Sequence, residues 1–142
     1  MTQSSNTPRG IRNNNPLNIR KGNNWQGERQ PQLDRSFEEF VSIEYGLRAA
    51  FKLFRNYITG FSGRSFKYNT VAKLIKRWAP PSENATQKYI DFVCKETGLD
   101  QNEVIWFSER KKMIDIARAM AFVECGVWIE REKFETAYDL FL

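Results

Sequence analysis

The acidic residues best placed to do chemistry gather in one short part of the chain, beside a segment rich in amides. They are Glu28, Asp34, Glu38, Glu39 and Glu44. A glycosidic bond is cut by a protonated carboxyl acting as general acid, usually with a second carboxylate. Glu44 is the best single candidate, because it lies at a predicted corner between a strand and a helix. The alternative is that Glu44 only complements the dipole of that helix.

Two neighbouring glutamates, Glu38 and Glu39, lie between phenylalanines in a predicted strand. Successive side chains of a strand point to opposite faces, so only one of the two can face a cleft. A solvated position on an edge strand is expected for at least one of them. Asp34 is expected to be a turn residue.

The amide-rich segment, residues 9–27, is a candidate sugar-binding surface. Asparagine competes with regular secondary structure by bonding to nearby backbone, which predicts an ordered polar loop or a tight hairpin. Amides match the hydroxyl and acetamido groups of sugars, and an indole can cover a pyranose ring. The candidate contacts here are Asn14, Asn15, Asn18 and Trp25.

A second wall of the same site is predicted at residues 77–86, where a tryptophan precedes two prolines and a polar run. The alternative is a plain helix end followed by a helix start with good capping residues. Tyr45 adds a ring that could stack on a ligand. The candidate contacts in this group are Tyr45, Trp78, Glu83, Asn84 and Thr86.

Composition excludes several classes of protein. The 142 residues contain no histidine, which removes Ser-His and Cys-His nucleophile systems and His-ligated zinc. Two cysteines alone make a poor metal site, so we expect no metal and no cofactor. The net charge of +5 favours polyanionic partners, but no nucleic-acid motif appears, so nucleic acid is an unlikely partner.

The hydrophobic pattern predicts a mainly α (α+β) chain: an arm over residues 1–12 and a single domain over 13–142. Short strands or a β-hairpin are expected before residue 42. Helices are expected from Ser42, from Asn69 or Thr70, from about Asn84 to Gly98, from Ser108 to Gly126 and from Ile129 to Leu140. No apolar run is long enough to span a bilayer. The first residues lack the pattern of a secretory signal.

Five blocks of the sequence, in this order, resemble a family of phage and prophage virion structural proteins with lysozyme-like character. The blocks are residues 9–19, 24–27, 37–40, 44–49 and 77–90. The resemblance implies a lysozyme-like helical domain with a small N-terminal lobe of loops or a hairpin. It also implies degradation of peptidoglycan during phage entry or lysis, by hydrolysis or lytic transglycosylation.

A looser similarity connects the chain to bacterial wall glucosaminidases, through residues 14–21, Trp25, 37–40 and 42–48. In those enzymes the main catalytic glutamate precedes the Asn-rich block, whereas the twelve residues before it here contain no acid. Either Glu44 or another acid replaces that glutamate, or the domain binds peptidoglycan without cutting it.

The expected partners are therefore bacterial peptidoglycan and other proteins of a virion or secretion machine. The expected location is the virion, or the periplasm reached from the bacterial cytoplasm without a signal peptide. Two alternatives stay open: a non-catalytic wall-binding or virion structural module, and a nucleic-acid-binding protein.

Overall fold

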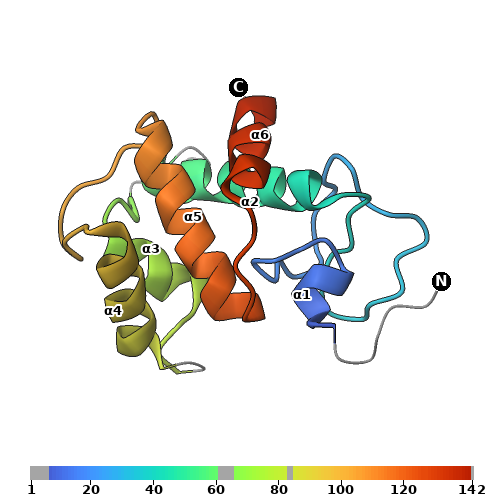
Figure 1. Ribbon diagram of the computed structural model, residues 1–142, viewed down its shortest axis with the longest axis horizontal. Helices are drawn as coiled ribbons and strands as arrows, with labels where there is room; N and C mark the ends of the chain where they lie inside the picture. The colour runs from blue at the N-terminus through green and yellow to red at the C-terminus, as the bar shows by residue number, and fades with distance from the viewer. Residues whose placement is uncertain (1–6, 61–65, 83–84, 142) are drawn as a thin grey trace.

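A computed structural model describes residues 7–60, 66–82 and 85–141 (Figure 1). The expected mainly helical chain is confirmed in this part. Its helices are α1 (Arg9–Arg12), α2 (Ile43–Thr59), α3 (Val71–Trp78), α4 (Thr86–Thr97), α5 (Arg110–Cys125) and α6 (Arg131–Phe141). None of these described helices combines the length and the hydropathy that crossing a bilayer requires.

The helix boundaries follow the capping signals in the sequence. Ser42 precedes α2, and its hydroxyl accepts a hydrogen bond from the Tyr45 backbone N–H at 3.4 Å. Thr70 does the same for α3, with the Lys73 N–H at 3.1 Å. Gly98, with φ 74°, ends α4 in the left-handed conformation that favours glycine. Three helices, α4, α5 and α6, begin about two residues later than their apolar patterns predict.

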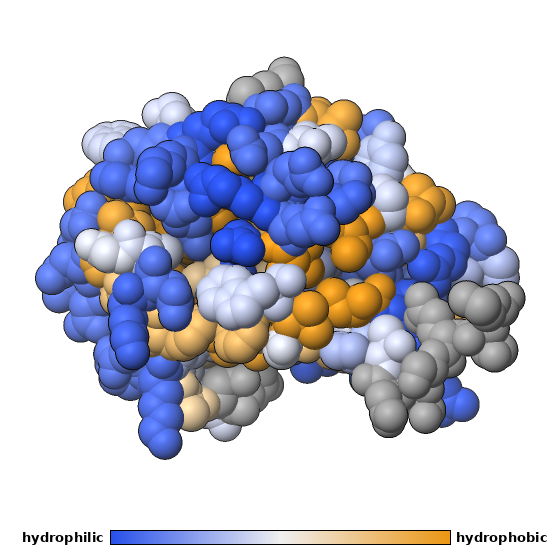
Figure 2. All heavy atoms as spheres, in the orientation of Figure 1, coloured by the Kyte–Doolittle hydropathy of each residue, from blue (hydrophilic) through white to orange (hydrophobic). Residues whose placement is uncertain are grey.

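The core is built around α2, which α6 crosses and packs against, while α5 packs on α4 (Figure 1). The Phe51 ring of α2 meets the Tyr138 ring of α6 edge-on, with centroids 5.4 Å apart. Phe51, Phe54 and Phe134 are fully buried. Figure 2 shows a largely hydrophilic face, with hydrophobic surface gathered across its lower middle.

The N-terminal segment, residues 7–42, lies at one end of the molecule and differs from the prediction. Residues 9–12, assigned to the arm from the sequence, form the short helix α1. The expected hairpin is not confirmed. Backbone pairing in this segment consists of isolated antiparallel bridges, Arg20 with Phe37 and Glu28 with Phe40. Side chains satisfy many of the backbone groups that a sheet would otherwise pair, as the contacts below show.

Candidate functional site

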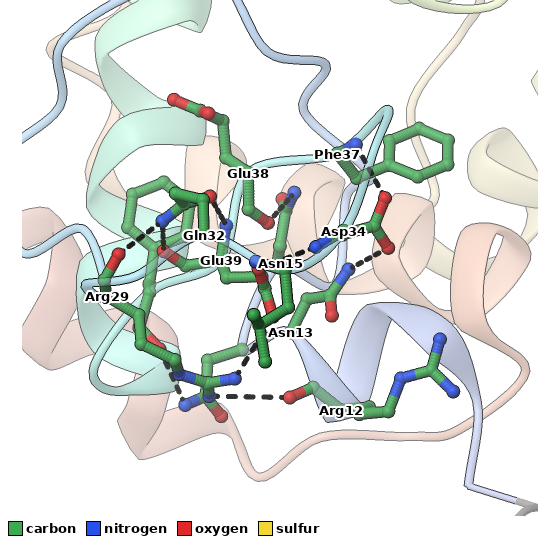
Figure 3. Close-up of polar contacts among 12 residues, drawn as sticks. Arg12, Asn13, Asn15, Arg29, Gln32, Asp34, Phe37, Glu38 and Glu39 are labelled. Carbon is green, nitrogen blue, oxygen red and sulfur yellow. Dashed lines mark hydrogen bonds and ion pairs between the residues drawn. The ribbon is translucent and has the colours of Figure 1, made fainter.

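The N-terminal segment is held together by a polar network around Asp34 (Figure 3). The Asp34 carboxylate accepts hydrogen bonds from the Arg9 guanidinium at 2.6 and 2.5 Å and from the Asn13 amide at 3.0 Å. It also accepts from the backbone N–H groups of Ser36 and Phe37. The bonds from Arg9 are the largest of the effects that hold the pKa of Asp34 well below its ordinary value. Asp34 is therefore a turn residue, as predicted, and also an anchor for α1.

The central asparagines turn their amides inward. Asn15 is 1% exposed. Its amide donates to the carbonyls of Ile19 and Glu38 at 2.9 and 3.0 Å, and its oxygen accepts from the Ile19 N–H at 2.9 Å. The Asn14 amide donates to the Phe40 carbonyl at 3.0 Å. Both donors of the Asn15 amide are therefore used within the protein, which leaves them unavailable for the predicted glycan contact. The Asn14 amide has one such bond, so its predicted glycan contact stays a prediction.

A glycine allows this segment to dock on α2. A Cβ atom at Gly46 would lie 1.9 Å from the backbone oxygen of Asn14. Asn14 itself has φ 53°, a left-handed conformation that asparagine tolerates better than most residues. On the neighbouring turn, the ring of Tyr45 lies against Gly27, where a Cβ would meet it at 2.3 Å. The Tyr45 side chain of α2 thus packs against the N-terminal segment at Gly27.

Glu38 and Glu39 have different surroundings, as the strand alternation predicts. The Glu39 carboxylate accepts hydrogen bonds from the backbone N–H groups of Leu33 and Asp34, the latter at 2.9 Å, and pairs with Arg29 at 3.4 Å. The Glu38 carboxylate points away from this network (Figure 3). Both residues are buried, so neither is the solvated edge residue that the sequence predicts.

Glu38 instead forms a carboxyl pair with Glu28. Burial, then the hydrogen bond and the negative charge of Glu28, raises the pKa of Glu38 to about 7. One oxygen of Glu38 and the Trp25 indole nitrogen are buried without a hydrogen-bond partner in the described part of the chain. The Trp25 backbone N–H donates to Glu28 at 2.6 Å. Neither glutamate lines any of the surface cavities described next.

Three adjoining cavities form a groove between the N-terminal segment and the helices. We call it the Trp78 groove. The central cavity, about 240 Å³, is lined by Asn18, Ile19, Arg20, Asn23, Leu53, Tyr57, Arg77 and Trp78. One neighbour, about 270 Å³, shares its Tyr57 end and adds Asn56, Phe66 and Tyr68. The other, about 260 Å³, shares its Trp78 end and adds Leu17, Phe37, Ala79 and Glu124. A groove of this kind suits an extended ligand.

Trp78 is fixed in the wall of the groove by several contacts. Its indole N–H donates to the Leu17 carbonyl at 3.1 Å, which ties α3 to the N-terminal segment. Its ring meets Phe54 and Tyr57 edge-on, at centroid distances of 5.3 and 6.3 Å. The indole is therefore a rigid part of a potential binding surface.

Glu124, near the end of α5, contributes a carboxyl to one end of the groove. Asn18 donates to one of its oxygens at 3.1 Å, and the Tyr89 hydroxyl donates to the other at 3.1 Å. Burial raises the pKa of Glu124, and these two hydrogen bonds partly oppose the rise. A carboxyl whose pKa is raised in a groove can hold a proton nearer neutral pH than an exposed glutamate.

The structure brings together only some of the residues predicted to form the site. Asn18 and Trp78 line the Trp78 groove. Glu44 does not; its carboxylate pairs with Lys133 of α6 at 3.4 Å. Thr86 is buried and donates to the Ala79 carbonyl at 2.7 Å. Glu83 and Asn84 lie outside the described residues, so their predicted contacts stay predictions.

The groove residues missed from the sequence come from distant parts of the chain. Arg20 and Arg77 lie within the two predicted segments but are not among the predicted glycan contacts. No motif marks Tyr57, and Glu124 lies in an apolar helical pattern that is typical of a core. The hydrogen bonds from Asn18 to Glu124, 106 residues apart, and the packing of α1 on α5 join that helix to the amide-rich segment. Within the described residues no group of three or more potential ligands is arranged to hold a metal ion.

Comparison with known proteins adds a phage relative. The chain is similar to Protein P5 of Pseudoalteromonas phage PM2, with 41% identity over 106 residues. The aligned part is 72% of this chain and 63% of that protein, so the chain spans less than two thirds of the relative's length. No family model matches the chain. The similarity supports the phage part of the expected resemblance, and the lysozyme-like part stays a prediction.

Proposed function

We propose that this chain is a virion-associated module of a phage and that it binds bacterial peptidoglycan in the Trp78 groove. The observation that carries the proposal is the lining of the central cavity, where the Trp78 indole lies with the amide of Asn23 and with Asn18, whose amide nitrogen donates to Glu124. An indole offers a flat apolar surface to a sugar ring, and amides both donate and accept hydrogen bonds. The similarity to a phage protein supports the association with a virion.

Co-sedimentation with purified sacculi, the intact peptidoglycan sacs of bacterial cells, tests this proposal. Wild type should pellet with the sacculi, and Asn23→Ala should reduce binding because it removes an exposed amide from the groove. Asn24→Ala, which changes an exposed neighbour outside the cavity lining, is the matched control. A well-folded wild type that stays in the supernatant would reject the proposal.

Cleavage of peptidoglycan is a second candidate function, favoured by the raised pKa of Glu124 at one end of the groove. Protonation of a glycosidic oxygen needs such an acid. Glu44, the acid predicted from the sequence, is the alternative candidate for the general acid.

Zymography separates these possibilities. If Glu124 is the acid, Glu124→Gln should abolish clearing and Glu44→Gln should leave it unchanged; the reverse pattern would identify Glu44. Binding without clearing by wild type would favour the non-catalytic module.

A further inference from the structure

Two arginines at the centre of the Trp78 groove lack a carboxylate partner among the described residues. Arg20 is exposed, and its guanidinium lies 5.1 Å from the centre of the Phe37 ring. The Arg77 guanidinium lies 4.7 Å from the centre of the Tyr57 ring and 6.0 Å from that of Tyr68. By contrast, Arg9 and three other arginines of the chain form ion pairs with carboxylates.

Aromatic rings position these guanidinium groups without neutralising their positive charge, as a carboxylate would. A guanidinium over a ring keeps its N–H donors at the edge, where they can bind the two oxygens of a carboxylate together. Arg20 and Arg77 line the same cavity of about 240 Å³, and Asn18 and Asn23 also lie in its wall. None of the described residues that line this cavity is acidic.

The carboxyl of the groove forms no ion pair with either arginine among the described residues. Glu124 and Arg20 both line the adjoining cavity, but the two oxygens of Glu124 accept from Asn18 and Tyr89 instead of from a guanidinium. The central cavity therefore combines two cations, amide groups and an indole, which is the chemistry of a pocket for an anionic ligand.

We propose that Arg20 and Arg77 bind carboxylates of the stem peptides of peptidoglycan, so that the groove recognises peptide-bearing wall polymer rather than neutral glycan. This inference rests on the proposed function, because peptidoglycan supplies both the sugar and the carboxylate. Peptidoglycan is favoured over nucleic acid because the groove offers two guanidinium groups and amides, whereas strand binding needs a basic surface that follows many phosphates.

Sedimentation with two forms of sacculi tests the inference: native sacculi, and sacculi whose carboxyl groups have been converted to neutral amides. Wild type should bind the amidated form at least about tenfold more weakly, the loss that about 1.4 kcal/mol produces. The double variant Arg20→Gln/Arg77→Gln should bind both forms equally and weakly. Arg35→Gln, an exposed arginine outside the groove lining, should behave as wild type.

Three other outcomes of the binding experiments would contradict the inference or the proposed function. Equal binding of wild type to both forms would overturn the inference and leave the proposed function intact. No binding to either form would reject the proposed function itself. Salt-sensitive binding of single-stranded DNA that the double variant loses, with unchanged binding to sacculi, would assign the arginines to nucleic acid.

Loss of fold is controlled separately, because Arg77 also packs on rings. Thermal unfolding of the double variant should match that of wild type within a few degrees. If the double variant is less stable, the single variant Arg20→Gln tests the inference, because Arg20 is exposed. This variant should discriminate less than wild type between native and amidated sacculi, and an unchanged discrimination would contradict the inference.

Discussion

Stability should fall as the pH rises from about 5 to about 8, because Glu38 keeps a proton in the folded protein. The pKa of Glu38 is about 7 in the fold, against an ordinary value of 4.5. A carboxyl whose pKa is raised stabilises the fold fully below its unfolded pKa, and this stabilisation is lost as the pH rises through its folded pKa. The chain has no histidine, so no imidazole titration obscures this range.

The size of the effect follows from the shift. One pKa unit corresponds to about 1.4 kcal/mol, and slightly less than two of the units lie within this pH range, which gives a loss of about 2.5 kcal/mol. Glu38→Gln replaces the carboxyl with a neutral group of the same shape, so the variant should avoid the repulsion from Glu28. It should be more stable than wild type at about pH 8, and its stability should depend less on pH.

Urea unfolding at several pH values, followed by circular dichroism, measures this dependence. Glu124→Gln is the second arm, because burial also raises the pKa of Glu124. Its effect should add to that of Glu38→Gln, since the two groups have separate partners. A wild-type stability that is constant over the range, or a Glu38→Gln variant with the same slope as wild type, would refute the reasoning.

Three further substitutions test how the N-terminal segment is held. Gly46→Ala should cost more than about 3 kcal/mol, because the new Cβ would clash with the Asn14 backbone; a near-neutral unfolding midpoint would contradict the close approach. Asn15→Ala should cost about 2–4 kcal/mol in denaturant unfolding, because buried backbone groups lose a partner; a loss below about 0.5 kcal/mol would contradict the contacts. Asp34→Asn should cost about 2 kcal/mol at neutral pH and remove the part of the stability that wild type loses as the pH falls below about 4; an unchanged acid titration would contradict the network.

The helical part of the fold could be predicted from the sequence because its signals are local. Ser42 and Thr70 begin helices as their positions indicate, and Gly98 ends one. These signals depend on residues within about one helical turn of each other. The predicted starts of α4, α5 and α6 are less accurate, because an apolar pattern does not fix where the first turn of a helix begins.

The N-terminal segment could not be predicted in detail because its contacts connect distant residues. Asn15 reads as a ligand-binding amide in the sequence, yet its partners include the Glu38 carbonyl, 23 residues away. The same holds for the groove, where Arg20, Tyr57 and Arg77 converge from three separate elements. The aromatic residue at position 78 was identified because it precedes a Pro-Pro corner, which is again a local signal.

The candidate acids also differ in whether a local sequence signal or tertiary packing places them. Glu44 was chosen for its place beside the amide-rich segment in the chain, but its carboxylate lies against Lys133 of α6. Glu124 reaches the groove only through the packing of α5 against the N-terminal segment, which no local pattern describes.

The central claim, that the Trp78 groove binds peptidoglycan, is tested most directly by an NMR titration with a soluble disaccharide-peptide fragment of the wall. The predicted result is a set of shifts confined to the groove, including the Trp78 indole N–H and the amides of Asn18 and Asn23. Shifts centred on another surface, such as the exposed Trp106 or Trp128, would contradict the claim. So would an unchanged spectrum at saturating fragment.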